Sequence, residues 1–121
     1  KKIEVKAAGF AQRFKRGKKR SAPTFNIEKH TCIPYGEPSA PPGAPVDRWA
    51  DCYVFCVHTE TDSKTANPLD LSKWEFIVMS TVDINRIFGG QKTVSLSVLE
   101  KHCSPVKFEE LRSTVDECIG K

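Results

Sequence analysis

The sequence predicts a single domain of the α/β class, more exactly a mixed α+β arrangement. Strand-like runs of alternating or continuous apolar side chains recur up to about residue 80, and helical patterns follow them. A near-continuous apolar run at 52–58 is typical of a strand that is buried on both faces. The 121 residues fit one core and leave no room for a second independent one.

The first predicted strand is IEVKAA, residues 3–8. Its apolar and polar side chains alternate, so Ile3 and Val5 share one face while Glu4 and Lys6 share the other. This pattern predicts a half-buried strand that holds a carboxylate and an ammonium side by side.

The middle of the chain alternates between loops and strands. Residues 9–23 read as a turn or short helix followed by an exposed basic loop, and 24–28 reads as a strand. The segment 34–46 contains five of the eight prolines, so we expect a loop there. The run DCYVFCVHT at 51–59 is the best candidate for the central strand, and the alternation at 73–80 predicts another strand.

Helical signals dominate the end of the chain. Ser80 or Thr81 can cap a short helix that ends at the glycine pair 89–90. Residues 92–99 read as a brief strand that runs into a helical turn, and 107–119 read as a final helix. The apolar stripe of that helix consists of Phe108, Leu111, Val115, Cys118 and Ile119.

Composition narrows the function classes. The net charge is +4, but residues 1–30 carry ten Lys or Arg against two Glu, so this end suits polyanions or simply solubility. Five cysteines are an odd number, which argues against a disulfide framework. Because no apolar run is long enough for a membrane span and no signal-peptide pattern is visible, we expect a soluble cytoplasmic protein without a membrane partner.

Glu4-Val5-Lys6 is the triplet with the clearest chemical potential. A carboxylate on a rigid strand can ligate Mg²⁺, and a neighbouring lysine can position a water for attack on phosphorus. The alternative is a solvated strand face whose charges pair with their neighbours. An acidic-x-Lys triplet also arises by chance, as at Asp62-Ser63-Lys64.

A basic run follows this strand directly and could contact a nucleic-acid backbone. Contacts to phosphates on that scale would make binding strongly salt dependent. The alternatives are a solvated, solubilising loop and a targeting-like patch. The candidate nucleic-acid-binding residues are Arg13, Lys15, Arg16, Lys18, Lys19 and Arg20.

Four segments, in this order, carry a family resemblance: IEVKAAGFAQRF, DRWADCYVFCVHTE, NPLDLSKWEFIVMST and FGGQKTVSL. Together they resemble a family of small bacterial proteins with the PD-(D/E)xK restriction-endonuclease-like fold, over about residues 3–118. The resemblance implies a restriction-endonuclease-like core, with a central mixed β-sheet flanked by short helices. It also implies a DNA endonuclease that depends on Mg²⁺ or Mn²⁺.

Carried over to this chain, the resemblance makes Glu4 the metal-binding carboxylate, Lys6 the signature lysine and Gln12 a third catalytic candidate. Asp51 is expected to brace the start of its strand, and Arg48 to pair with it or to meet phosphate. Trp74 is most simply a core residue, and Glu75 matches a family position without known chemistry.

The chain departs from the family pattern in one respect. Nucleases of this fold place a further metal-binding Asp on the strand before Glu4, and only Lys1, Lys2 and Ile3 precede it here. We therefore expect either the C-terminal portion of a longer nuclease-like domain or a noncatalytic nucleic-acid-binding relative. A protein-interaction module that docks the proline-rich 34–46 loop is a further alternative, and homo-oligomerisation stays open.

Overall fold

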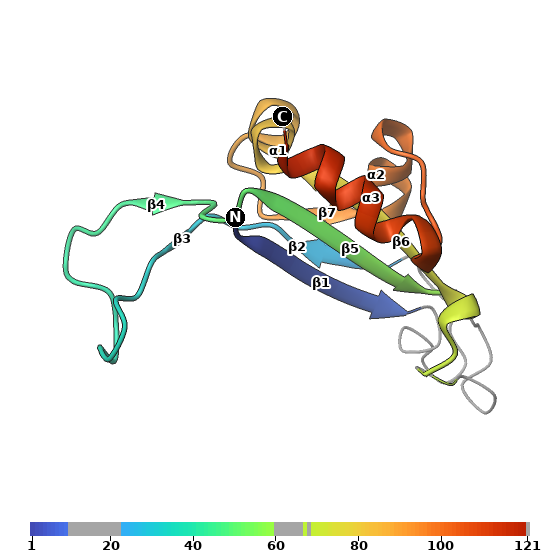
Figure 1. Ribbon diagram of the computed structural model, residues 1–121. Coiled ribbons are helices and arrows are strands. Elements are labelled where there is room, and N and C mark those ends of the chain that lie inside the picture. Colours follow the sequence, from blue (N-terminus) through green and yellow to red (C-terminus); the bar gives the residue numbers. More distant parts are fainter. Residues whose placement is uncertain (10–22, 60–66, 68, 121) are drawn as a thin grey trace, which may run out of the picture.

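The protein is described by a computed structural model that covers residues 1–9, 23–59, 67 and 69–120 (Figure 1). Its architecture is mixed α+β, with a three-stranded mixed sheet, two small two-stranded pairs and three α-helices in this part of the chain. None of the helices in the described residues is long and apolar enough to cross a membrane.

The three-stranded sheet has the order β1-β5-β6, formed by β1 (Ile3–Gly9), β5 (Cys52–His58) and β6 (Trp74–Ser80). β1 runs parallel to β5, whereas β6 runs antiparallel to it. A short 3₁₀ turn, η2 (Leu71–Lys73), leads into β6. Every residue of β5 is buried, which confirms the prediction of a central strand.

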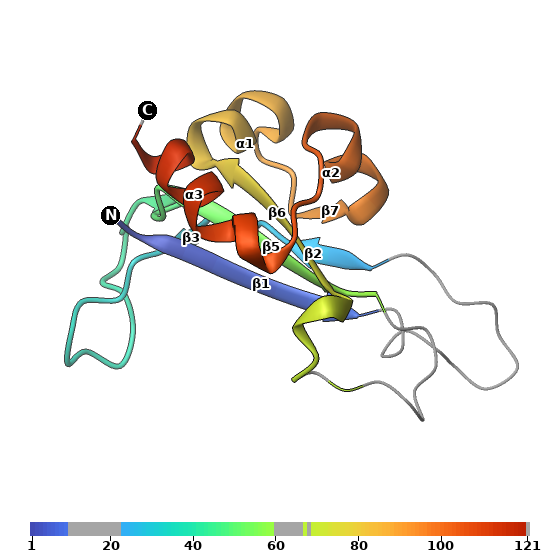
Figure 2. The same ribbon diagram turned by 45° about the vertical axis from the view of Figure 1, so that its right-hand side comes forward.

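Different elements cover the two faces of this sheet (Figures 1 and 2). Helix α3 (Phe108–Ile119) packs on one face, where Cys52, Val54, Cys56 and Phe76 form a small core. Tyr53, Phe55 and Val57 point to the other face, because side chains alternate along β5. The elements on that face are β2 (Thr24–Asn26), α1 (Thr81–Phe88), β7 (Thr93–Ser95) and α2 (Leu96–His102).

Helix α1 begins and ends where its sequence predicts. Of the two candidate caps, Ser80 is the one used, since its hydroxyl accepts a hydrogen bond of 3.2 Å from the backbone N–H of Asp83. The helix ends at Gly89, whose φ of 55° is a conformation that favours glycine.

Arg48 is buried, with 4% of its surface exposed, and does not meet Asp51. Its guanidinium donates instead to the backbone oxygens of Ile27, Gly89 and Gln91 and to Asn85. The expectation that Arg48 pairs with Asp51 or meets phosphate is therefore wrong, because the side chain is buried and makes four hydrogen bonds to oxygens of other residues. Asp51 does brace the start of its strand, as expected: its carboxylate accepts a hydrogen bond of 2.8 Å from the N–H of Lys2.

The proline-rich segment projects from the body as an arm between β3 (His30–Thr31) and β4 (Val46–Asp47) (Figure 1). Two hydrogen-bonded turns shape it, one from Pro34 to Glu37 and one from Pro41 to Ala44. The third residue of each turn is a glycine with positive φ, the position at which a type II turn requires it. Residues 34–45 contain no helix or strand, whereas Val46, the last residue of the expected loop, begins β4.

Candidate functional site

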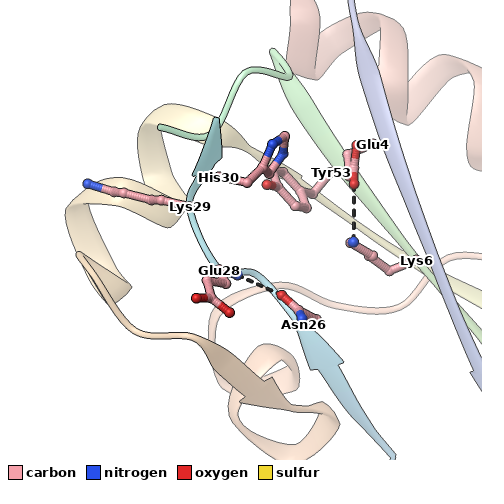
Figure 3. Close-up of a pocket in the computed structure, with 7 residues that line it drawn as sticks. All are labelled: Glu4, Lys6, Asn26, Glu28, Lys29, His30 and Tyr53. Carbon is pink, nitrogen blue, oxygen red and sulfur yellow. Dashed lines mark hydrogen bonds and ion pairs between the residues drawn. The ribbon is translucent and has the colours of Figure 1, made fainter. Parts of the chain in front are cut away.

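A pocket of about 290 Å³ opens between the charged face of β1, the central strand and the segment that joins β2 to β3 (Figure 3). Glu4 and Lys6 reach it from β1, and Tyr53 reaches it from β5. The remaining lining residues are Asn26, Glu28, Lys29 and His30.

Glu4 and Lys6 lie together at this pocket, as their spacing on the strand predicts. Nζ of Lys6 is 3.1 Å from Oε1 of Glu4, and the two side chains are 30% and 38% exposed, respectively. Because both side chains are partly exposed, a ligand that enters the pocket from solvent can contact them.

The burial of the two faces of β1 differs from that of an ordinary half-buried strand. Ile3 and Val5 are 44% and 61% exposed, so the charged face is the more covered one. The reason is tertiary. Helix α3 buries apolar side chains of β5 and β6 on the face that Ile3 and Val5 share, whereas the chain around β2 and β3 lies over the opposite face, beside Glu4 and Lys6.

The sequence analysis did not identify the pocket residues that β2 and the segment after it contribute. Asn26, Glu28 and His30 recur at every second position, the spacing that places side chains on one side of an extended chain. Asn26 also fixes the local backbone, because its side-chain oxygen accepts a hydrogen bond of 2.8 Å from the N–H of Glu28. This two-residue period is the signal that could have found them.

Tyr53 forms the inner wall of the pocket and is only 2% exposed. Burial raises the pKa of its phenol, and the nearby carboxylate of Glu4 raises that pKa further. Tyr53 therefore stays neutral at physiological pH and can offer an uncharged hydroxyl to a ligand.

The pocket brings two carboxylates, Glu4 and Glu28, to one opening. Within the described ranges, no group of three or more His, Cys, Asp or Glu side chains is placed to hold a metal ion. Glu4 and Glu28 are the carboxylates of this pocket that could contribute to a Mg²⁺ site, because this ion binds proteins through one or two carboxylates together with water and substrate phosphate oxygens.

The other candidate residues fall into two groups. Trp74 and Glu75 do not line this pocket: Trp74 stacks edge-on against His58 with ring centres 5.0 Å apart, and Glu75 lies 3.5 Å from Nζ of Lys107. Gln12 and the basic run lie outside the described residues. That run comprises Arg13, Lys15, Arg16, Lys18, Lys19 and Arg20.

Comparison with known proteins adds no relative to this picture. No family model, no curated protein and no solved structure matches the chain.

Proposed function

We propose that the pocket beside β1 hydrolyses phosphodiester bonds of DNA with the help of a divalent metal ion. The observation that carries this proposal is the position of Glu4 and Lys6, which lie side by side on a rigid strand and line an open pocket. A carboxylate next to an ammonium on a rigid strand is a pairing that metal-dependent phosphodiester hydrolysis can use, because the carboxylate can ligate the ion and the ammonium can position a water.

The cofactor in this proposal is Mg²⁺ or Mn²⁺, and Glu4 is the residue that would hold it, with Glu28 lining the same opening. When bound, such an ion neutralises charge on the phosphate and lowers the pKa of a water molecule.

Lys6 has two tasks in this reaction. Its ammonium can donate hydrogen bonds to the attacking water and thereby orient it, and its positive charge favours a phosphate in the pocket. Gln12 would be the third catalytic residue, and the basic run from Arg13 to Arg20 would contact the DNA backbone. This division of labour follows the resemblance to PD-(D/E)xK nucleases, and the parallel pairing of β1 with β5 beside antiparallel β6 suits a core of that kind.

Cleavage of supercoiled plasmid and of single-stranded DNA tests the proposal. We expect cleavage with Mg²⁺ or Mn²⁺ that disappears in Glu4→Gln and in Lys6→Met. The matched control is Glu100→Gln, an exposed carboxylate on α2, which should cleave like the unaltered chain. If all variants cleave equally, the activity belongs to a contaminant and the proposal fails.

A noncatalytic nucleic-acid-binding module is the second candidate, and the basic run between Arg13 and Arg20 in the sequence favours it. In this candidate Glu4 and Lys6 form only a surface ion pair, with Nζ and Oε1 3.1 Å apart, and take no part in a reaction. This candidate predicts salt-sensitive DNA binding without a divalent ion. Binding would then survive Glu4→Gln and disappear when charges between Arg13 and Arg20 are reversed.

A further inference from the structure

The outer edge of β1 offers a row of backbone hydrogen-bonding groups. Lys2 turns both of its backbone groups toward the β5 side: its C=O accepts from the N–H of Asp51 and its N–H donates to the Asp51 carboxylate, each at 2.8 Å. Because backbone groups alternate in direction along an extended strand, those of Ile3, Val5 and Ala7 point to the opposite edge. No strand in the described part of the chain pairs with that edge (Figure 2).

The opposite edge of the same sheet, along β6, is partly paired. There Phe76 of β6 exchanges two backbone hydrogen bonds with Val106, at 2.9 and 2.8 Å, so the segment before α3 covers part of that edge. An edge seven residues long that pairs with no other described strand, with apolar side chains along one face, is a template for another strand.

The side chains of β1 are complementary to a second copy of the same strand. When two copies run antiparallel around a two-fold axis at Val5, Ile3 of each copy lies opposite Ala7 of the other. In the same register Glu4 of each copy lies opposite Lys6 of the other, which gives two cross-strand pairs of opposite charge.

The backbone supports the same register. Val5 points its N–H and C=O outward, so the two copies of Val5 would form a hydrogen-bonded antiparallel pair, and Ile3 and Ala7 would form the next pairs along the ladder. The exposed surface of Ile3 and Val5, 44% and 61%, would be partly covered by the partner's strand. Backbone geometry, charge and apolar surface thus select one register.

We infer that β1 is a homodimerisation edge, through which two copies of the chain join their sheets into one continuous six-stranded sheet centred on Val5. A two-fold axis normal to the sheet leaves both Glu4/Lys6 pockets on the same face of the assembly. This inference does not depend on any catalytic role for those residues.

The first test is the oligomeric state of the whole chain by analytical ultracentrifugation over a range of concentrations. We expect a monomer–dimer equilibrium that Val5→Pro weakens by roughly tenfold or more, since proline removes the N–H that faces the partner. The N–H of Val5 points away from β5, so the pairing inside each copy is preserved, and circular dichroism checks that the variant is folded. A chain that stays monomeric at every concentration overturns the inference.

The second test separates the dimer from the proposed nuclease. Glu4→Lys places like charges opposite each other and should weaken the dimer, whereas the exchange Glu4→Lys with Lys6→Glu should restore it. That exchange would still abolish metal-dependent cleavage, so the two proposals can fail independently. Glu100→Lys is the control and should dimerise normally. If neither Val5→Pro nor Glu4→Lys weakens dimerisation, the dimer forms through another surface and the inference is wrong.

Discussion

The guanidinium of Arg48 donates a hydrogen bond of 2.7 Å to the side-chain oxygen of Asn85, 37 positions further along the chain. It also donates to the carbonyls of Ile27, Gly89 and Gln91, at 2.7, 2.6 and 3.0 Å. One buried side chain thus joins the end of β2, the approach to β5 and both sides of the turn that follows α1. Arg48 is therefore a structural centre of the fold rather than part of the pocket.

Arg48→Lys should lower the free energy of unfolding by about 2–4 kcal/mol, because a lysine cannot replace the planar fork of donors and leaves buried carbonyls without partners. Denaturant unfolding measures this difference. Arg86→Lys is the matched control: Arg86 forms an exposed ion pair with Asp83, and its replacement should cost about 0.5 kcal/mol or less. Equal losses in both variants would show that Arg48 has no special structural role.

The glycine pair after α1 gives a second comparison. Gly89 has a φ of 55° and a ψ of −123°, whereas Gly90 has no positive φ, and an added methyl group meets nothing within 4 Å at either position. Gly89→Ala should therefore cost about 1–3 kcal/mol through backbone strain alone, while Gly90→Ala should be close to neutral. Thermal unfolding of both variants measures this difference. An unchanged stability of Gly89→Ala would contradict the backbone conformation at Gly89.

The elements of the fold could be predicted from the sequence because their signals are local. The apolar run of β5, the cap at Ser80 and the glycine pair after α1 depend on side chains within a few positions of one another. The network of Arg48 could not be predicted in this way, since its partners lie between 21 and 43 positions away. Only the folded chain brings those carbonyls to one guanidinium.

The candidate site was predictable in part for the same reason. That Glu4 and Lys6 share a face follows from the two-residue period of a strand, and the structure confirms it. Which face of β1 is covered depends on helix α3, which lies on β5 and β6 instead of β1, and a local pattern cannot show this. The contribution of Glu28 and His30 to the pocket likewise depends on how the chain around β2 and β3 lies against the sheet.

The cysteines should differ in their reactivity toward iodoacetamide. Cys32 is exposed, whereas Cys52 and Cys56 are buried in β5. Burial, together with a hydrogen bond to Cys118, raises the pKa of Cys52 to about 12, and burial also raises the pKa of Cys56. At a mildly alkaline pH, mass spectrometry should find Cys32 alkylated first and the two β5 cysteines protected until the protein unfolds. Early labelling of Cys52 would contradict the packing of α3 on the sheet.

Asp51 should contribute to the acid sensitivity of the fold. The hydrogen bond from the N–H of Lys2 holds the pKa of this carboxyl below its ordinary value of 3.8. A carboxyl whose pKa is lower in the folded state stabilises the fold above its unfolded pKa, and that contribution is lost as the pH falls through its folded pKa. Asp51→Asn should therefore make the melting temperature fall less steeply below about pH 4 than in the unaltered chain. Identical slopes would show that the Asp51 brace carries no pH dependence.

Tyr53 can report on the position of Glu4 without any assay of activity. Burial is the first cause that raises the pKa of the Tyr53 phenol above its ordinary value of 10.0, and the charge of Glu4 is the second. Glu4→Gln removes that charge and should lower the pKa of Tyr53, which should still stay above the ordinary value because burial persists. In a Tyr35→Phe background Tyr53 is the one remaining tyrosine, so tyrosinate absorbance after a rapid pH jump follows this phenol before the protein unfolds.

Glu28→Gln, at the same pocket, is the control and should shift the pKa of Tyr53 less, because Glu28 is not among the charges that raise it. Equal shifts in both variants would mean that the carboxylate of Glu4 does not face Tyr53, and the pocket could then not hold Glu4 and Lys6 in the arrangement that the proposed hydrolysis needs.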